Sequence, residues 1–274
     1  MLQIRYFLVA VQFFTRIPIT GRVALWMGFD PTWISRCTRF FPLIGLLLGL
    51  FLATLFNTLL LVFSQGISIV LTTIAGILVT GAFHEDGFAD FCDGFGGGQT
   101  PERIITIMRD SRVGAYGAIG IVLMLLTKIQ ALSSLDAVWV GAALVVGHSA
   151  SRGFAVIVMT LLPYVETKHV EKNIANEINL KGGIEQNQPK PVAAGLQLQD
   201  WLPALCFGFM PALVLAWALD AWLPMSCGLL CAALLNTWMF LTLRRRLGGY
   251  TGDTLGATQQ LTEVSFYLGM LATV

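Results

Sequence analysis

Long apolar runs dominate the pattern of this chain, and short polar stretches separate them. From Phe40 to Phe83 there is no charged residue, and several later runs are almost as apolar. About 20 mostly apolar residues in a helix are enough to cross a bilayer. We therefore predict seven membrane-spanning helices, at about 40–63, 66–83, 114–133, 138–162, 202–219, 222–243 and 253–274.

Two segments do not follow the spanning pattern. Residues 4–19 are apolar but short and carry arginines around them, which favours a helix in the membrane interface, with a buried re-entrant segment as the alternative. Residues 164–200 mix Asn, Gln, Gly and Pro with charges of both signs, which predicts a cytoplasmic loop with little fixed structure. We expect residues 1–274 to form a single integral membrane domain.

Composition supports this class of protein. Hydrophobic residues make up 55% of the chain and charged residues only 12%, with a mean hydropathy of +0.72, whereas a soluble domain carries about 25% charged residues. The expected fold is an all-α, polytopic transmembrane bundle in contact with membrane lipid. A net charge of +1 gives no sign of a nucleic-acid partner. The five cysteines are scattered and suggest neither a disulfide framework nor a zinc site.

The positions of Lys and Arg predict the orientation. Lys128 and Arg152 lie inside predicted spans, and the other 15 of the 17 Lys and Arg residues fall on one side of the seven-span arrangement. The positive-inside rule places that side, and the N-terminus, in the cytoplasm. Lys128 lies far along its span, where its long side chain is expected to reach the outer interface. The pattern thus predicts a multi-pass membrane protein with its N-terminus in the cytoplasm and its C-terminus outside.

Charge returns abruptly in the stretch HEDGFADFCDGFGGG, residues 84–98, at the cytoplasmic end of the second predicted span. If the helix continues past Phe83, Asp86, Asp90 and Asp93 occupy positions i, i+4 and i+7 on one face. Three carboxylates on one face need a cation, and oxygen-only ligands suit Mg²⁺ or Ca²⁺. A solvated helix end rich in acids is the alternative. The glycines at 96–98 predict a helix stop or backbone N–H groups that contact phosphate.

A short amphipathic helix is predicted next, starting at Thr100 as N-cap with Pro101 at the first position. It leads into Arg109, Asp110 and Arg112, just before the third predicted span. Arginine offers a fork of donors to phosphate oxygens, so these residues are candidates for substrate binding. Ordinary cytoplasmic arginines that follow the positive-inside rule are the alternative.

Three more charged positions stand inside or at the edge of predicted spans. Arg152, with His148 one turn before it, lies roughly 15 Å inside the membrane, a depth at which charge needs a partner or a watery cavity. Glu263 is equally costly in lipid, and an ion pair between Arg152 and Glu263 is one reading. Asp253 lies near the start of the last predicted helix, where the helix dipole favours an acid.

Acids, arginines and a predicted Mg²⁺ site at one cytoplasmic face indicate phosphoryl or nucleotidyl transfer, in which a metal screens phosphate charge. A transporter would also carry charge inside the membrane. It would have less use for three acids at metal-ligand spacing followed by a glycine-rich loop. We therefore expect an enzyme.

Six motifs, in order along most of the chain, resemble one family, the adenosylcobinamide-GDP ribazoletransferases, also called cobalamin-5′-phosphate synthases. They are FTRIP (14–18), HEDGFADFCDGFGGG (84–98), RDSRVGAYGAIG (109–120), SASRG (149–153), PY (163–164) and GDTLGATQQLTE (252–263). Residues 165–200 are longer than the family pattern, and Phe88 stands where leucine is expected.

The resemblance implies that GDP-activated adenosylcobinamide is joined to α-ribazole or its 5′-phosphate with Mg²⁺ present, and that GMP is released. It would assign Asp86, Asp90 and Asp93 to the metal, with one of them or Glu85 helping to deprotonate the hydroxyl. Phosphates would be held by Arg109, Arg112 and Arg152. Asp110, His84, Asp253 and Glu263 would also belong to the substrate-binding site. Asp253 and Glu263 would serve there as metal ligands or as partners of Arg152, and His84 as a further candidate base. A homo-oligomer or other enzymes of cobalamin synthesis are possible partners.

A CDP-alcohol phosphotransferase is the closest rival, because that family also carries aspartates at a cytoplasmic helix end. Here Asp90 directly follows Ala89, where that family has arginine, and its downstream aspartate pattern is missing. A transporter, or a membrane subunit of one, is the non-enzyme rival.

Overall fold

Every regular element in the described part of the chain is a helix. The computed structural model describes residues 1–28, 30, 33–165 and 198–274. The helices are α1 (Leu2–Phe14), α2 (Gly21–Met27), α3 (Trp33–Cys37), α4 (Phe41–Leu59), α5 (Gln65–Thr80), α6 (Phe83–Gly97), α7 (Pro101–Met108), α8 (Ala115–Ser134), α9 (Ala137–Leu161), α11 (Leu198–Ala218), α12 (Trp222–Arg246) and α13 (Gly252–Leu271), with a 3₁₀ turn at Thr38–Phe40. The all-α prediction is confirmed. Of the predicted 164–200 loop, residues 166–197 lie outside the described residues.

Within that part, five helical segments are long and apolar enough to cross a membrane. They are Trp33–Leu59, Ala115–Ser134, Ala137–Leu161, Asp200–Ala218 and Trp222–Arg246, and α5 with α6 adds a sixth if this bent pair is one broken span. Large apolar side chains are exposed on the outer helices, as Leu123, Leu126 and Leu234 illustrate. An apolar outer surface is what contact with lipid requires, so the protein is a polytopic helical membrane protein.

The seventh predicted span is a helix, but an interior one. α13 packs against α12, α6, α9 and α8, and most of its residues are buried. Its polar residues, among them Thr258, Gln259 and Glu263, keep it below the hydropathy expected of a lipid-facing span. Neighbouring helices shield this polarity, which explains how a polar helix runs through an apolar bundle. α9 is also an interior helix, because 94% of its most apolar stretch is buried.

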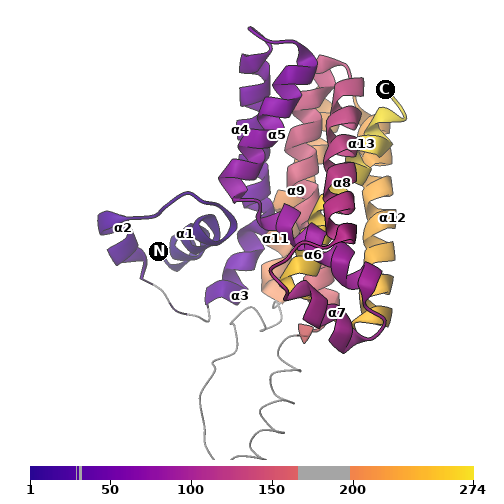
Figure 1. The fold of residues 1–274 in the computed structure, drawn as a ribbon. Helices are drawn as coiled ribbons and strands as arrows, with labels where there is room; N and C mark the ends of the chain where they lie inside the picture. Colours follow the sequence, from indigo (N-terminus) through magenta and orange to yellow (C-terminus); the bar gives the residue numbers. More distant parts are fainter. Residues whose placement is uncertain (29, 31–32, 166–197) are drawn as a thin grey trace, which may run out of the picture.

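The second predicted span does not continue past Phe83 as one helix. The chain breaks at Gly81 and Ala82, both left-handed with φ of 67° and 57°, and α6 leaves at 89° to α5. Glycine adopts this conformation freely, whereas alanine does so rarely. Arg16 N–H donates to the Val79 carbonyl at 2.7 Å and satisfies one acceptor at the broken end. α6 and α7 consequently lie across one end of the bundle (Figure 1).

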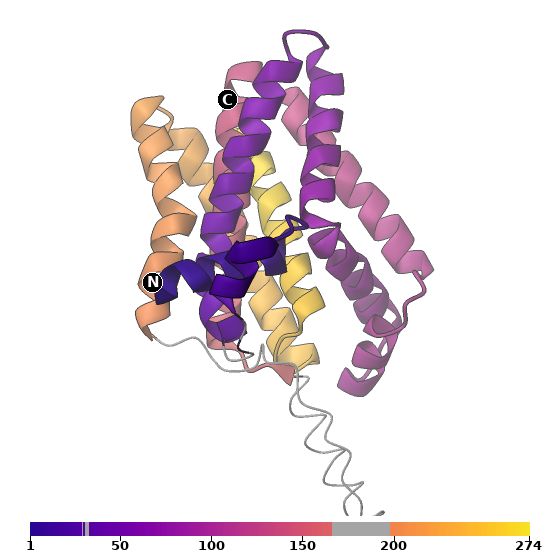
Figure 2. The ribbon, with the colours of Figure 1, turned by 90° about the vertical axis from the view of Figure 1, so that its left-hand side faces the viewer.

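The N-terminal helices lie beside the bundle rather than in it. α1 and α2 project from the flank of the upright helices, and in Figure 2 they cross in front of them. α1 ends at Phe14, where Thr15 takes an extended conformation, so the predicted 4–19 helix is shorter than expected. At 13 residues α1 is too short to span a bilayer, and the choice between interfacial and re-entrant remains a prediction.

Close contact between α4 and α9 depends on two glycines one turn apart. A Cβ on Gly45 would overlap the backbone carbonyl of His148, and one on Gly49 would come within 2.8 Å of the Leu144 oxygen. Small residues at i and i+4 let helix backbones approach closely in membranes, where van der Waals packing drives association. The pair positions α9, which carries His148 and Arg152.

Gly45→Ala should therefore lower the thermal unfolding temperature of the purified protein in detergent. The added methyl meets backbone, which cannot rotate away, and overpacking of this kind costs about 1–3 kcal/mol. Gly66→Ala is the matched control, because nothing lies within 4 Å of a Cβ there. Equal unfolding temperatures for the two variants would contradict the proposed role of Gly45.

Candidate active site

α6 directs its polar side chains to three different surroundings. Asp86 is exposed and Asp90 half-buried on one face, whereas His84 is buried on the opposite side. Asp93 is buried against the start of α8. The predicted helical spacing of the acids is thus confirmed on α6, although their carboxylates do not all share one environment.

A second helix brings a further acid to Asp90. Asp253, Asp86 and Asp93 all lie close enough for their charges to act on the half-buried Asp90 carboxylate. α13 approaches α6 at Gly87, where a Cβ would lie 2.9 Å from the Cα of Asp253. Thr251 and Thr254 form the capping box of α13, so Asp253 stands in the first turn without being the N-cap. The predicted position of Asp253 near this helix start is confirmed.

The donor chemistry of this acid cluster, Asp86, Asp90 and Asp253, suits Mg²⁺. Carboxylate oxygens are the ligands this ion prefers. Within the described residues, no three His, Cys, Asp or Glu side chains converge closely enough to make a complete metal site. Mg²⁺ commonly takes only one or two protein carboxylates and completes its shell with water and substrate phosphates. The arrangement therefore fits an ion shared with a phosphorylated substrate.

Asp93 is engaged elsewhere. Its Oδ2 accepts a hydrogen bond from Gly114 N–H at 2.7 Å, and its Oδ1 accepts one from Gly117 N–H at 2.9 Å. Both carboxylate oxygens are therefore bound to the start of α8. The structure connects Asp93 with α8 more closely than with the other acids of its face.

The glycine run ends α6, as one of the two readings predicted. The helix stops at Gly97, and Gly98 is extended, with φ of −93° and ψ of 137°, rather than left-handed. Arg246 from α12 donates to the Phe95 carbonyl at 2.8 Å and to the Gly98 carbonyl at 2.6 Å. The ring of Tyr116 would lie 2.6 Å from a Cβ on Gly96. Close packing and an arginine clamp thus account for this helix end.

The predicted arginines lie in the exposed loop that joins α7 to α8. Thr100 caps α7 as expected and accepts from Arg103 N–H at 3.3 Å. Arg112 donates two side-chain hydrogen bonds to the Asp110 carboxylate, at 3.0 and 2.7 Å. These bonds lower the pKa of Asp110 to about 2. Arg109 ends α7 and is also exposed.

An open cavity of about 440 Å³ adjoins this loop. Its lining includes Asp93, Arg103, Thr106, Asp110, Arg112 and Tyr116. A volume of several hundred Å³ is in the range of small-molecule sites. The hydroxyl and guanidinium groups on its walls suit an anionic ligand next to the acidic face of α6.

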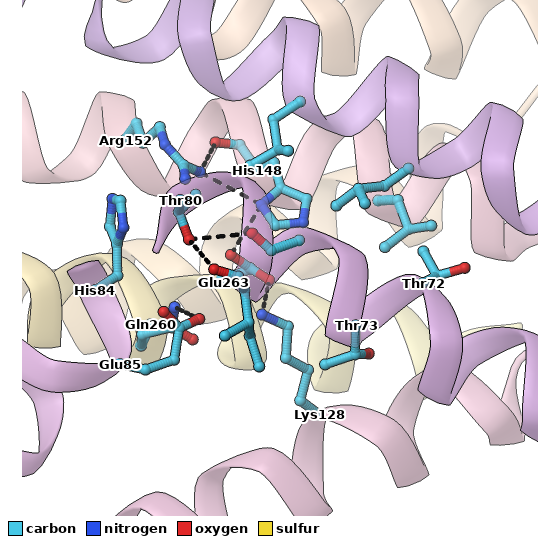
Figure 3. Close-up of a pocket in the computed structure, with 15 residues that line it drawn as sticks. Thr72, Thr73, Thr80, His84, Glu85, Lys128, His148, Arg152, Gln260 and Glu263 are labelled. Carbon is cyan, nitrogen blue, oxygen red and sulfur yellow. Dashed lines mark hydrogen bonds and ion pairs between the residues drawn. The ribbon is translucent and has the colours of Figure 1, made fainter. Parts of the chain in front are cut away.

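Glu263 is the hub of a buried polar network (Figure 3). Its Oε1 lies 2.5 Å from Lys128 Nζ and accepts a hydrogen bond from the Tyr267 hydroxyl at 3.0 Å. Its Oε2 accepts from Gln259 at 2.5 Å and lies 3.2 Å from His148 Nδ1. Glu263 is fully buried, so these four partners replace water around its charge.

The predicted ion pair between Arg152 and Glu263 does not form directly. Arg152 donates through Nη1 to the His148 carbonyl at 2.9 Å, and His148 stands between it and Glu263. Arg152 also lies over the ring of Phe41, 5.4 Å from its centre. The expectation that Lys128 reaches the outer interface is wrong, because its ammonium is buried against Glu263. A charged residue in an apolar span requires a partner, but the sequence does not identify which residue that partner is.

His84 and Glu85 face the same interior from α6. Gln260 donates to Glu85 Oε1 at 2.9 Å, while both ring nitrogens of His84 and Glu85 Oε2 have no hydrogen-bond partner among the described residues. They border a small cavity of about 20 Å³, which has room for about one water molecule. The pocket drawn in Figure 3 is therefore too tight for a phosphorylated substrate in this conformation.

The fold and this site define a polytopic helical membrane protein with carboxylates and arginines gathered at one end of its bundle. The sequence model of the cobalamin-5-phosphate synthase family matches residues 6–271. The chain belongs to this family.

Curated relatives agree with this assignment. The chain is 41% identical to a protein of Polaromonas naphthalenivorans, with 97% of both chains covered, and 39% identical to one of Leptothrix cholodnii, with 98% of this chain and 96% of the relative covered. A protein of Shewanella frigidimarina is also 39% identical, over 98% and 95%. All three are called adenosylcobinamide-GDP ribazoletransferase. No solved structure matches the chain.

Proposed function

We propose that this protein is an adenosylcobinamide-GDP ribazoletransferase, which joins GDP-activated adenosylcobinamide to α-ribazole or its 5′-phosphate and releases GMP. Its product is adenosylcobalamin or adenosylcobalamin 5′-phosphate. The names of full-length relatives support this reaction. The structural observation that supports it is the approach of Asp253 on α13 to the acidic face of α6. Asp93 of the same helix, α6, lines one open cavity together with Arg112.

The reaction needs one exchange of bonds at phosphorus. A ribose hydroxyl oxygen of the acceptor forms a bond to the phosphorus attached to the cobinamide side chain, and the bond from that phosphorus to the GMP oxygen breaks. The hydroxyl proton passes to a carboxylate of α6, for which Asp86, Asp90 and Glu85 are the candidates. Gln260 orients Glu85 by its 2.9 Å hydrogen bond, but Glu85 Oε2 is buried in the tight pocket, so Asp86 and Asp90 are the accessible candidates.

Mg²⁺ is part of the proposal. Asp86 and Asp90 would hold it, with Asp253 as the third nearby carboxylate and Asp93 on the same helix face. When bound, the ion would neutralise charge on the phosphates and on the departing GMP.

Arg109 and Arg112 are proposed to hold the phosphates of the donor. Both are exposed in the loop, and Arg112 already has its fork ordered by Asp110. Arg152 is buried over the ring of Phe41 and donates to the His148 carbonyl, so its proposed part is to support the buried network around Glu263. Phosphate oxygens would compete with Asp110 for the same guanidinium.

The proposed setting is a bacterial inner membrane, with the acid cluster and the arginine loop facing the cytoplasm. The clustering of Lys and Arg on one side of the spans supports this orientation. Membrane lipid surrounds the bundle, and a homo-oligomer or contact with other enzymes of cobalamin synthesis is part of the same proposal.

The direct test uses membranes that contain the protein. GDP-cobinamide and α-ribazole are added with Mg²⁺, and cobamide and GMP are measured by mass spectrometry. We expect both products in equal amounts, and we expect chelation of Mg²⁺ to stop their formation. Membranes with the Asp90→Asn variant are the control for background reaction. Absence of cobamide from wild-type membranes would refute the proposed function.

A further inference from the structure

Asp93 caps a helix to which it does not belong. α8 starts at Ala115, and its N-cap is Gly114, which has no side chain to offer. The first N–H groups of a helix have no partner within the helix and are usually satisfied by the N-cap side chain. Here the carboxylate of Asp93 accepts from Gly114 N–H at 2.7 Å and from Gly117 N–H at 2.9 Å, 21 and 24 residues along the chain.

The helix start and the carboxylate fit each other sterically. A Cβ on either Gly114 or Gly117 would overlap the carboxylate oxygens of Asp93. A Cβ on Gly117 would also lie 2.9 Å from the Ala89 carbonyl of α6. Glycine at both positions therefore lets α8 approach α6 until its amides reach Asp93, which is only 9% exposed. The negative charge also matches the positive end of the α8 dipole.

This contact lies directly behind the arginine loop. Gly114 follows Arg109, Asp110 and Arg112 in the chain, so the position of the start of α8 determines where the arginine loop ends. Asp93 and Gly114 also line the open cavity together with Arg112. On its other side Asp93 is joined through α6 to Asp90 and Asp86. The capping contact thus connects the two halves of the site.

We infer that Asp93 is a positioning residue, which ties the start of α8 to α6 and so holds the arginine loop at a set distance from the acid cluster, rather than a metal ligand. The catalytic consequence rests on the proposed function, because it assumes that the loop arginines hold phosphate. The capping contact itself does not depend on that function.

The contact is tested without substrate by hydrogen–deuterium exchange of the purified protein in detergent. In Asp93→Ala, amides of residues 113–120 should exchange at least about 10-fold faster than in wild type. In Asp93→Asn, which keeps one carbonyl acceptor, they should lie between these two proteins. Asp90→Ala should leave this segment unchanged. Wild-type protection in both Asp93 variants would overturn the inference.

A double-mutant cycle tests the link to the reaction. Asp93→Ala and Gly114→Ala should each raise KM for GDP-cobinamide at least about 10-fold and change kcat less than about 3-fold. A Cβ on Gly114 would meet only side-chain atoms of Asp93, so an alanine at 93 leaves room for it. The double variant should therefore be no worse than Asp93→Ala alone, because sites that share one contact are not additive. Ala118→Ser, on the exposed side of the same helix turn, is the matched control and should behave as wild type.

The outcomes separate the two proposals. If wild type makes no cobamide, the proposed function fails, while exchange at 113–120 still decides the capping role. If wild type is active and Asp93→Ala loses kcat as severely as Asp90→Asn and needs far more Mg²⁺, Asp93 is a metal ligand and the positioning role is refuted. Additive effects of Asp93→Ala and Gly114→Ala would refute it as well.

Discussion

Asp90→Asn is expected to lower the rate of GMP release by at least about 100-fold at saturating Mg²⁺ and substrate. Losing one preorganised charge-stabilising group commonly costs two to three orders of magnitude in rate. Asp90 is half-buried and stands among Asp253, Asp86 and Asp93, so its carboxylate is central to the negative field of the cluster. Asparagine keeps the shape of the side chain and removes its charge. Release of GMP by purified protein is the measurement.

Asp136→Asn is the matched control for this prediction. Asp136 is exposed and is the N-cap of α9, a position that asparagine fills equally well. Its activity should equal that of wild type. Asp253→Asn should fall with Asp90→Asn, because α13 brings this acid to the same cluster. GMP release by Asp90→Asn at nearly the wild-type rate would contradict the assignment of the acid cluster.

Lys128→Met is expected to destabilise the protein by about 3–5 kcal/mol, the usual cost of removing one partner of a buried ion pair. The ammonium of Lys128 lies 2.5 Å from Glu263 Oε1, and Glu263 is fully buried. Methionine fills a similar volume but leaves the Glu263 charge without its nearest cation. A large fall in the unfolding temperature in detergent, followed by tryptophan fluorescence, is the expected result.

The double variant Lys128→Met/Glu263→Gln should regain most of this loss. Both charges are then removed together, and replacing a buried pair by neutral groups is often close to neutral. Gln259 and Tyr267 can still hydrogen-bond the glutamine carbonyl oxygen. Thr127→Met, one position before Lys128 and exposed, is the control and should unfold like wild type. A double variant as unstable as Lys128→Met would show that Lys128 stabilises the bundle by another route.

Much of the site was predictable from local pattern. The spacing of Asp86, Asp90 and Asp93 placed them on one helix face, and Thr100 and Pro101 marked the start of α7, since both signals depend only on nearby residues. Asp253 in the first turn of α13 followed from the same kind of reasoning. The break at Gly81 and Ala82 was missed, because the apolar run continues through it and shows no interruption.

Long-range partners could not be predicted. Lys128 and Glu263 are charged residues inside the bundle, so each of them requires a partner. Which residue that partner is depends on how the helices of the whole bundle pack together. Asp93 binds amides 21 and 24 residues away, and no local signal separates a metal ligand from a helix cap. The hydropathy of residues 253–274 predicts one more membrane span, and only the packing of α13 against its neighbours reveals an interior helix.

The sequence by itself determined the all-helical membrane class, the family and the residue types at the candidate site, because hydropathy, helix period and motifs are encoded in neighbouring residues. Which partner each of these residues contacts depends on the tertiary structure alone. In the folded bundle Asp253 lies near Asp86 and Asp90, Asp93 binds amides at the start of α8, and Lys128 forms an ion pair with Glu263. The physical reason is that a buried charge or an unpaired amide must find its partner in space, and packing brings that partner from distant parts of the chain.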